Sequence, residues 1–384
     1  MPTVNEINWN RVPSPCFVCD LGLLRKNLTI LKHVQDTSGA KVLLALKGFA
    51  MWHTFPIVRE YLSGVCASSV DEARLGAEHF GKEMHSFAPA YKSEQLADYI
   101  RFSDHMSFNS FKQWHQHRDA INASPKKISC GIRINPEHSE VETAIYDPCA
   151  PGSRLGVRIE DFRSRGDLTG IQGLHCHNLC EKNVDSLQRT WAVVEQQFGK
   201  YIPQLKWLNL GGGHHITRAD YDVAQLIALI QSIKAKYNVE VYLEPGEAVA
   251  LNTGVLIAQV MDIVTNTMDI AILDTSASTH MPDVLEMPYR PHVIDSGLAN
   301  EKKHTYRLGG MTCLAGDVMG DYSFDKPLEI GQRIAFTDMI HYSMVKTTTF
   351  NGMRLPSIAT YEPDTDTIQV VKTFGYEDYR DRLS

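Results

Sequence analysis

The stretch K-V-L-L-A-L-K-G-F-A, residues 41–50, indicates the fold of this chain. Val42 to Leu46 form a short apolar run that ends abruptly at Lys47 and Gly48. A strand that is apolar on both faces is typical of a buried parallel sheet, and α/β barrels carry their chemistry at the carboxyl ends of such strands. An amine in apolar surroundings loses basicity, which suits Lys47 to form a Schiff base. The alternative is a lysine that simply leaves the sheet for solvent.

Strand-like and helical patterns alternate along the chain from this stretch onward. Amphipathic patterns predict helices over residues 21–34, 70–80, 184–198 and 220–237. Apolar runs predict strands over 41–47, 64–69, 84–90, 105–110, 127–135, 170–178, 206–213 and 239–246. Eight such units predict an α/β fold, a (β/α)8 TIM barrel that spans residues 20–253. The proline-containing interval between Asn135 and Ile171 is expected to hold a long functional or partner-facing loop.

The sequence pattern changes after residue 253, where strand-like runs follow one another with few helical patterns between them. These runs cover 255–264, 269–273, 305–308, 333–337 and 367–372. They predict a β domain over residues 254–384. The N-terminal residues 1–19 are expected to complete this domain through a strand at Pro15–Asp20.

Composition and charge narrow the class of protein. The 384 residues are 43% hydrophobic and 22% charged, which is a normal globular balance. The net charge of −7 gives no support for nucleic-acid binding and favours cationic small molecules. No apolar run reaches membrane-spanning length, and the N-terminus has no signal-peptide core, so no membrane partner is expected. The eight scattered cysteines indicate reduced thiols in a cytoplasmic protein, and the C-F-V-C pair Cys16 and Cys19 would point to opposite faces of a strand.

Four motifs fall at the carboxyl ends of predicted barrel strands, where catalytic and ligand groups collect. They are Lys47, His175-Cys176-His177-Asn178, Gly211-Gly212-Gly213 and Glu244-Pro245-Gly246. The glycine triplet lets backbone N–H groups approach a phosphate, although glycine runs also make plain turns. Glu244 could hold a protonated ring nitrogen, or it could be a surface acid before a turn.

The histidine motif allows three interpretations. His175 and His177 share one face of a strand and could hold a metal together with His214 and His215. They could also be two core histidines, or one could stack on a flat cofactor above the other. A lysine, a stacking histidine, a phosphate cradle and a ring-nitrogen carboxylate together describe pyridoxal 5′-phosphate. We therefore expect this cofactor and no metal.

The motifs resemble those of the fold type III, alanine racemase-like pyridoxal-phosphate decarboxylases, which include ornithine, arginine and diaminopimelate decarboxylases. The resemblance covers nearly the whole chain. It rests on A-L-K-G (45–48), L-H-C-H (174–177), N-L-G-G-G (209–213), E-P-G-E (244–247), T-C-L-A-G-D (312–317), and Tyr342 followed by F-N-G (350–352).

Within this family the chain is similar to the branch that acts on carboxynorspermidine or carboxyspermidine. That similarity rests on R-I-N-P (133–136), Y-D-P-C-A-P-G-S-R-L-G (146–156), H-N-L-C-E (177–181), E-P-G-E-A (244–248) and H-M-P-D (280–283). The chain departs from the wider family at three positions near the phosphate. Leu179 and Cys180 replace a glycine and a serine, and Glu247 replaces the arginine of ornithine-type enzymes.

The resemblance implies a role for each candidate residue. Lys47 binds the cofactor, His177 stacks on its ring, Glu244 holds the ring nitrogen, and Gly211–Gly213, Gly246 and Tyr342 hold the phosphate. Cys313 reaches the active site of a neighbouring subunit and protonates the product, which implies a homodimer with active sites at the subunit interface. Asp274, Asp283 and Glu286 are the candidates for binding the cationic tail of the substrate. Arg154 and Asp317 resemble a pair of residues that form an ion pair across that interface.

Three rival functions remain open on the sequence. The first is the same reaction on another basic amino acid, namely diaminopimelate, ornithine or arginine. The second is a metal hydrolase that uses the four histidines. The third is a non-catalytic cofactor-binding protein, whose known form lacks the β domain that this chain carries.

Overall fold

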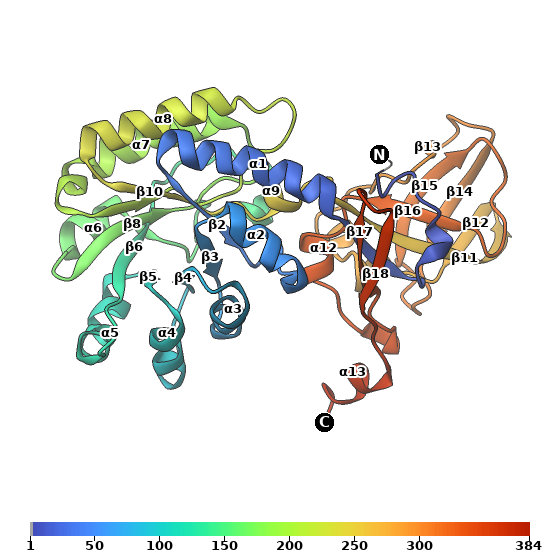
Figure 1. The fold of residues 1–384 in the computed structure, drawn as a ribbon, viewed down its shortest axis with the longest axis horizontal. Coiled ribbons are helices and arrows are strands. Elements are labelled where there is room, and N and C mark those ends of the chain that lie inside the picture. Colours follow the sequence, from blue (N-terminus) through green and yellow to red (C-terminus); the bar gives the residue numbers. More distant parts are fainter. Residues whose placement is uncertain (1–2) are drawn as a thin grey trace. The chain divides into compact units, whose positions relative to one another are not determined.

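The computed structural model describes residues 3–384, which divide into two compact units (Figure 1). One unit comprises residues 27–249. The other combines residues 250–384 with the start of the chain up to Lys26. None of the described helices is long and apolar enough to cross a membrane.

The unit of residues 27–249 is built on a closed ring of parallel strands. In order around the ring, each strand pairs with the next, and β6 pairs with β5 to close it. The order is β5 (His105–Phe108), β4 (Glu83–Phe87), β3 (Gly64–Ala67), β2 (Lys41–Ala45), β10 (Glu240–Leu243), β9 (Trp207–Asn209), β8 (Ile171–Cys176) and β6 (Ser129–Asn135). The prediction of an eight-stranded barrel is confirmed for the described residues.

Most of the predicted strands were too long at their carboxyl ends. The strand β2 ends at Ala45, because the N–H groups of Gly48 and Phe49 both donate to the Ala45 carbonyl and turn the chain out of the sheet. Six of the other predicted ends overran the observed ones in the same way, most of all at Gly213, four residues beyond β9, whereas the end of β6 at Asn135 was predicted correctly. Lys47, His177, Gly211 and Glu244 therefore lie on loops just beyond the strands.

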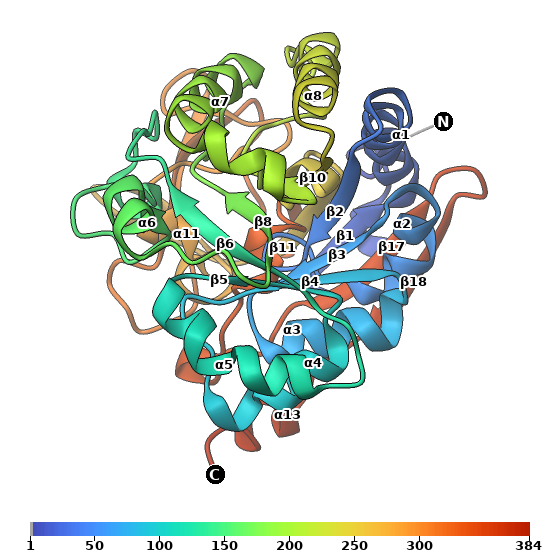
Figure 2. The same ribbon diagram turned by 90° about the vertical axis from the view of Figure 1, so that its left-hand side faces the viewer.

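Helices surround the barrel, as Figure 2 shows in a view along it. They are α1 (Leu21–Ser38), α2 (Phe55–Tyr61), α3 (Val70–Leu75), α4 (Leu96–Phe102), α5 (Phe111–Ala123), α6 (Ile159–Arg165), α7 (Val184–Phe198) and α8 (Val223–Tyr237). The predicted helix over 184–198 is confirmed, with Leu187, Trp191, Val194 and Phe198 buried at helical spacing. The helix α8 begins three residues later than predicted, because Asp222 caps it by accepting from the Gln225 N–H.

The interval after β6 contains the expected long loop. It runs from residue 136 to 156 with one short 3-10 turn at Ala144–Tyr146. The chain then returns as the short strand β7 (Val157–Arg158), which pairs with β6, before α6 begins.

The other unit is a mixed sheet in which the N-terminal strand is internal. The strand β1 (Cys16–Asp20) pairs antiparallel with β11 (Gly254–Asn266) and parallel with β17 (Ser357–Glu362). The remaining strands are β12 (Met268–Leu273), β13 (Gly297–Leu298), β14 (His304–Gly309), β15 (Val318–Phe324), β16 (Arg333–Thr337) and β18 (Thr367–Lys372). The sequence analysis missed β13, β15 and β17. The strand β15 carries Gly320 and Asp321, which are typical of turns, but its pairing with β14 keeps it extended.

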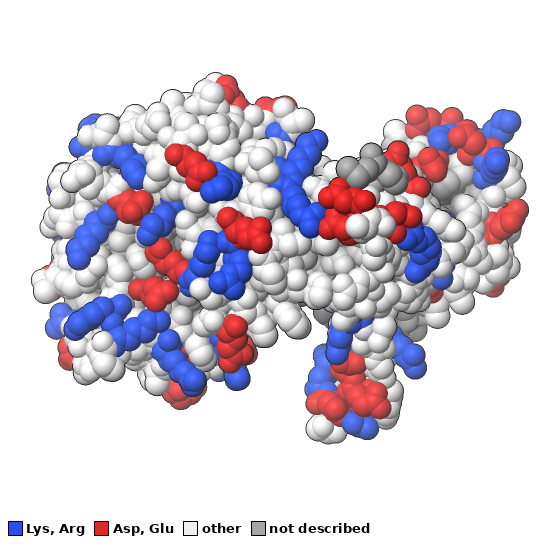
Figure 3. Space-filling model, in the orientation of Figure 1, with Lys and Arg blue, Asp and Glu red and all other residues white. Residues whose placement is uncertain are grey.

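The charged side chains and the cysteines in the structure agree with what the composition indicated. Acidic and basic side chains intermingle on the face that Figure 3 shows. Each of the eight cysteines is free, and Cys16 and Cys19 are both buried.

Candidate active site

The predicted motifs of the barrel meet in one pocket at the carboxyl ends of its strands. The pocket has a volume of about 210 Å³. Its lining includes Lys47, His175, His177, Gly212 and Glu244. These residues are contributed by β2, β8, β9 and β10 or by the loops that follow them.

Lys47 lies on the turn after β2, and its side chain lines this pocket. Its side chain is exposed, but the surface it exposes lines the pocket. The surrounding protein and the nearby Arg133 guanidinium lower the pKa of the Lys47 amine. This environment favours the uncharged amine, which is the nucleophilic form.

His177 lies beside Lys47 with a defined tautomer. The N–H of Gly212 donates to Nδ1 of His177 over 3.1 Å, so the ring proton of neutral His177 must be on Nε2. That Nε2 lies 3.4 Å from Nζ of Lys47. Burial and then the Lys47 amine lower the pKa of His177 well below its usual range, so the neutral ring is the stable form. The Arg133 guanidinium fixes the same loop by donating to the His177 carbonyl over 2.8 Å.

Glu244 is a largely buried carboxylate held by side chains of neighbouring strands. Nδ2 of Asn209 donates to its Oε1 over 2.6 Å, and Nε2 of His175 lies 3.3 Å from its Oε2. Burial alone would raise the pKa of Glu244, but the imidazole and the amide outweigh burial and lower it. The Cys66 thiol also faces this carboxylate, and burial followed by the charge of Glu244 raises the pKa of Cys66. Glu244 is therefore an ionised group that can accept a hydrogen bond from a cationic N–H.

The glycine triplet packs so closely against neighbouring backbone that no side chain fits at Gly212 or Gly213. A Cβ on Gly212 would lie 2.2 Å from the Glu244 carbonyl oxygen, and one on Gly213 would lie 1.9 Å from that of Leu179. The Gly211 N–H donates to Oδ1 of Asn209 over 2.8 Å. Among the described residues, the Gly213 N–H has no intramolecular acceptor. Gly246 packs against Gly48 in the loop after β2, where its own Cβ would lie 3.2 Å from the Gly48 Cα.

Of the three positions that depart from the wider family, two are at least partly buried and the third, Glu247, has a side-chain partner. Leu179 is buried and Cys180 is half-buried. The Glu247 carboxylate lies 3.3 Å from Nε2 of His215. An imidazole therefore accompanies this acid near the glycine turn.

The four histidines of the metal interpretation do not converge. His175 faces Glu244 and His177 faces Lys47 and Gly212. Nδ1 of His214 pairs with the Tyr221 hydroxyl at 2.6 Å, and Nδ1 of His215 pairs with Arg218 at 3.0 Å. Each imidazole thus has its own partner in the described part of the chain.

The candidate residues of the other unit group around two features. The first is the segment 312–317, where Cys313 is exposed and its N–H donates to Oδ1 of Asn351 over 2.7 Å. Asp317 is buried in this segment and accepts from the hydroxyls of Ser276 and Thr312 over 2.9 and 2.6 Å. The hydrogen bond from Cys313 to Asn351 therefore joins the motifs T-C-L-A-G-D and F-N-G, which are far apart in the sequence.

The second feature is an ion-pair cluster of the candidate tail-binding acids. Lys346 Nζ bonds both the Asp283 and the Glu286 carboxylates of the short helix α11 (Asp283–Glu286). Asp274 instead directly follows β12, where its Oδ1 accepts from the Gln259 N–H over 2.8 Å. Tyr342 is half-buried at the start of the short helix α12 (Tyr342–Val345).

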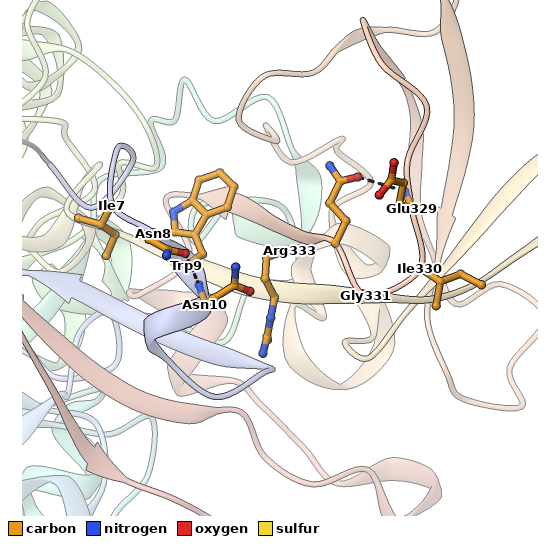
Figure 4. A pocket seen from close by; sticks show the side chains of 9 residues that line it. Ile7, Asn8, Trp9, Asn10, Glu329, Ile330, Gly331 and Arg333 are labelled. Atoms are coloured by element: carbon orange, nitrogen blue, oxygen red, sulfur yellow. Dashed lines mark hydrogen bonds between the residues drawn. The ribbon is translucent and has the colours of Figure 1, made fainter.

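A wider hollow in the same unit carries none of the candidate residues. It has a volume of about 620 Å³ and lies between the N-terminal turn and the loop before β16 (Figure 4). Trp9, Glu329, Ile330 and Arg333 are among the described residues that line it, and no lysine, histidine or cysteine is. Its lining offers no nucleophile of the kind that the barrel pocket holds.

Sequence reasoning gave no site role to several residues that line the barrel pocket, among them Arg133, Phe87 and Cys66. The Arg133 guanidinium lies over the Phe87 ring, 4.5 Å from its centroid. The signal for Arg133 was present in the strand sequence G-I-R-I-N, where an arginine between two isoleucines in a barrel strand must face the interior.

Comparisons with known proteins show the family of this chain. Residues 16–340 match the family described as "Pyridoxal-dependent decarboxylase, C-terminal sheet domain". A carboxyaminopropylagmatine decarboxylase of Synechocystis sp. is 47% identical, across 97% of this chain and 96% of that protein. A carboxynorspermidine/carboxyspermidine decarboxylase of Campylobacter jejuni is 45% identical, across 97% and 98%. The crystal structure of carboxynorspermidine decarboxylase from Campylobacter jejuni, complexed with norspermidine, has a TM-score of 0.90 and 44% identity, and covers 97% of this chain and 100% of that one.

Proposed function

This chain belongs to the pyridoxal-dependent decarboxylase family, and we propose that it releases CO2 from a carboxylated polyamine, carboxynorspermidine or carboxyspermidine. The enzyme is a carboxy-lyase that uses pyridoxal 5′-phosphate. The products would be norspermidine or spermidine, which gives the enzyme a place in polyamine biosynthesis. The similarity over nearly the whole chain to proteins named for these substrates carries the proposal.

The residues of the pocket fit the cofactor at each of its functional ends. Lys47 offers an amine of lowered pKa for the aldehyde, and the buried Glu244 carboxylate offers an acceptor for a protonated ring nitrogen. The turn at Gly211–Gly213 comes too close to its neighbours to carry side chains, and the Gly213 N–H is available to a phosphate oxygen. We assign Gly246 and Tyr342 to the same phosphate group on the resemblance alone.

The proposed mechanism divides the reaction among the residues of the chain. When bound, the cofactor supplies an electron sink for the pair left by the departing carboxyl group. Glu244 would hold the proton on the ring nitrogen of the bound cofactor. His177 directs its Nε2 proton toward the Lys47 amine, which favours the uncharged amine over the ammonium; the amine would turn from this contact to react with a carbonyl carbon.

We assign the final proton transfer to Cys313 of a second subunit, which would protonate the Cα of the product. Its exposure and its backbone bond to Asn351 support a residue presented at a surface. Mixing Lys47→Ala with Cys313→Ala tests this assignment. Random exchange between homodimers would give each mixed dimer one intact site, so about a quarter of wild-type activity should return. No recovery after verified subunit exchange would rule out a site shared between two chains.

We assign the cationic tail of the substrate to the acids Asp274, Asp283 and Glu286. Lys346 neutralises part of the charge of Asp283 and Glu286, so an amine of the tail would compete with it for them. Asp283→Asn should raise the KM for carboxynorspermidine roughly tenfold with little change in kcat, since a charged hydrogen bond contributes about 1.5–3 kcal/mol. An unchanged KM would remove Asp283 from the tail site.

A second candidate substrate comes from the Synechocystis relative, whose name is carboxyaminopropylagmatine decarboxylase. Its tail ends in a planar guanidinium, whereas the polyamines end in an ammonium group. Release of CO2 by the cofactor-loaded enzyme should therefore be compared over carboxynorspermidine, carboxyspermidine, carboxyaminopropylagmatine, diaminopimelate, ornithine and arginine. The proposal expects kcat/KM to be at least about tenfold higher on carboxynorspermidine or carboxyspermidine than on the other compounds. A preference for carboxyaminopropylagmatine would select the second candidate, and a preference for any of the last three would overturn both.

A further inference from the structure

We propose that Asn209 is a positioning residue that ties the two ends of the cofactor site together through one buried amide. Its Nδ2 donates to Oε1 of Glu244 over 2.6 Å, and its Oδ1 accepts from the Gly211 N–H over 2.8 Å. The inference rests on the proposed function, in which Glu244 holds the ring nitrogen and the glycine turn holds the phosphate. Asn209 itself touches neither group.

The orientation of this amide follows from its partners. The Gly211 N–H is a backbone donor, so the atom of Asn209 that faces it must be the oxygen. The NH2 group must then face Glu244, whose carboxylate can only accept while it is ionised. Both hydrogen bonds are therefore satisfied in a single orientation, and Asn209 is only 2% exposed.

The barrel register explains why these residues meet. Asn209 is the last residue of β9, and it pairs with His175 of β8 on one side and with Tyr242 of β10 on the other. Glu244 lies two residues beyond Tyr242, so its side chain points to the same side as that of Tyr242. Two consecutive strands and the loop after the third thus bring the side chains of His175, Asn209 and Glu244 together near the carboxyl end of the barrel.

The surroundings of Glu244 make Asn209 its firmest neutral donor. The other titratable or charged groups that act on this carboxylate come from several strands and the loops after them: His175 of β8, His177 after β8, His85 of β4, Cys66 of β3, Lys47 after β2 and Arg133 of β6. His175 Nε2 is farther from the carboxylate than Asn209 Nδ2, at 3.3 against 2.6 Å. Loss of the amide would leave the orientation of Glu244 to the weaker contact.

The substitution Asn209→Asp tests the two hydrogen bonds separately, because it keeps the bond with Gly211 and changes the bond with Glu244. Aspartate has the shape of asparagine and can still accept from the Gly211 N–H. Its second oxygen, however, would face the Glu244 carboxylate, and two carboxylates at that distance share one proton with a raised pKa. While that proton is present, the introduced carboxyl group would mimic the amide donor, and once the proton leaves, the two charges repel.

The experiment measures the dissociation constant of pyridoxal 5′-phosphate, by its absorption, for wild type and variant between about pH 5.5 and pH 9. We expect the ratio of variant to wild type to be near one at the acid end and to rise roughly tenfold or more toward alkaline pH. Asn135→Asp is the matched control. Asn135 is also buried at the end of a barrel strand, and its Oδ1 accepts from the N–H two residues on, but its amide faces the Pro148 carbonyl. Its ratio should stay flat with pH.

Asn209→Ala guards against a charged variant that fails to fold. It introduces no charge and removes both hydrogen bonds, so it should weaken cofactor binding at every pH. A pH-independent ratio for folded Asn209→Asp, or unchanged binding by Asn209→Ala, would overturn the inference. Because these readouts need no substrate, they remain valid if the proposed substrate is wrong. A wild-type protein that binds no pyridoxal phosphate would instead contradict the proposed function itself.

Discussion

The Nε2 atom of His177 lies 3.4 Å from the Nζ atom of Lys47. The Gly212 N–H occupies the other ring nitrogen, so the proton of the neutral ring is on Nε2 and points toward the lysine. A charged ammonium has no lone pair to accept that proton. The pair is therefore mutually satisfied only when Lys47 is the free amine, and this links the glycine turn to the reactivity of the lysine.

The first prediction concerns the reaction of the cofactor-free protein with an aldehyde. Because desolvation by the surrounding protein and the charge of Arg133 lower the pKa of Lys47, its amine should capture pyridoxal at half its maximal rate below pH 10.5, the ordinary midpoint for lysine. Stopped-flow absorption over a pH series measures this midpoint. A midpoint at or above the ordinary value would show that Lys47 is a normal solvated ammonium.

Substitution of His177 tests the proposed stacking and the tautomer together. His177→Gln can still satisfy the Gly212 N–H but has no ring, so the affinity for the cofactor should fall roughly 5- to 10-fold, as expected for about 1 kcal/mol of aromatic stacking. We also expect kcat to fall roughly a hundredfold because Lys47 loses its aligned partner. Equilibrium binding and steady-state kinetics measure the two effects.

His214→Gln is the control for this substitution. His214 is a buried histidine of the same barrel whose Nδ1 pairs with the Tyr221 hydroxyl. It should lower thermal stability but leave the affinity for the cofactor near that of wild type. Equal effects of the two variants on cofactor affinity would mean that His177 is only a core residue.

The glycine turn should reject even one methyl group. In Gly212→Ala the new Cβ would meet the Glu244 carbonyl oxygen at 2.2 Å, so backbone must shift, at a cost of about 1–3 kcal/mol of stability. Because Glu244 moves with its backbone, cofactor affinity should fall as well. Thermal unfolding and cofactor titration measure the two quantities.

Gly152→Ala provides the comparison. Nothing lies within 4 Å of a Cβ at this position, although its φ of +80° makes alanine strained there. It should cost about 1–2 kcal/mol of stability while cofactor affinity stays unchanged. If Gly212→Ala also left the affinity unchanged, the turn would not shape the cofactor site.

A cluster at the amino ends of the barrel strands should make the unit sensitive to acid. The imidazoles of His85 and His105 stack with centroids 4.0 Å apart, and Nε2 of each faces Oε1 of Glu83, at 2.9 and 3.2 Å. The Lys41 ammonium lies 2.9 Å from the other Glu83 oxygen. Burial and then His85 lower the pKa of His105 to about 3. Burial opposes the charge of Glu83, but its hydrogen bonds to His85, Lys41 and Tyr242 outweigh burial and lower its pKa.

The sign of the pH effect follows from these two directions. Both groups bind a proton less readily in the folded chain than in the unfolded one, so acid favours unfolding. The contribution of neutral His105 to the free energy of unfolding is complete above pH 6.5. It is lost as the pH falls toward 3, by at most about 1.4 kcal/mol per pH unit. The free energy of unfolding of His105→Gln should therefore fall less steeply between about pH 6 and pH 4 than that of wild type. Denaturant titrations over this range measure the slopes, and identical slopes would contradict the lowered pKa.

Much of the barrel and its site could be predicted because both depend on local patterns. The apolar run 42–46 specifies a buried strand, and the carboxyl ends of parallel strands bring Lys47, His177, the glycines and Glu244 to one face. Most strand ends could not be predicted, since they depend on turn hydrogen bonds such as the one from the Gly48 N–H to the Ala45 carbonyl. Asn209 and Cys66 were missed as partners of Glu244 because only the pairing of neighbouring barrel strands brings their side chains close to it.

The covalent attachment of the cofactor gives the most direct test of the central claim. Borohydride reduction of the cofactor-loaded protein, followed by proteolysis and mass spectrometry, identifies the lysine that carries the phosphopyridoxyl group. The account predicts that this group is found on Lys47 and that Lys47→Arg carries none. A label on another lysine, or an unlabelled Lys47 in enzyme that is active and fully loaded, would contradict it.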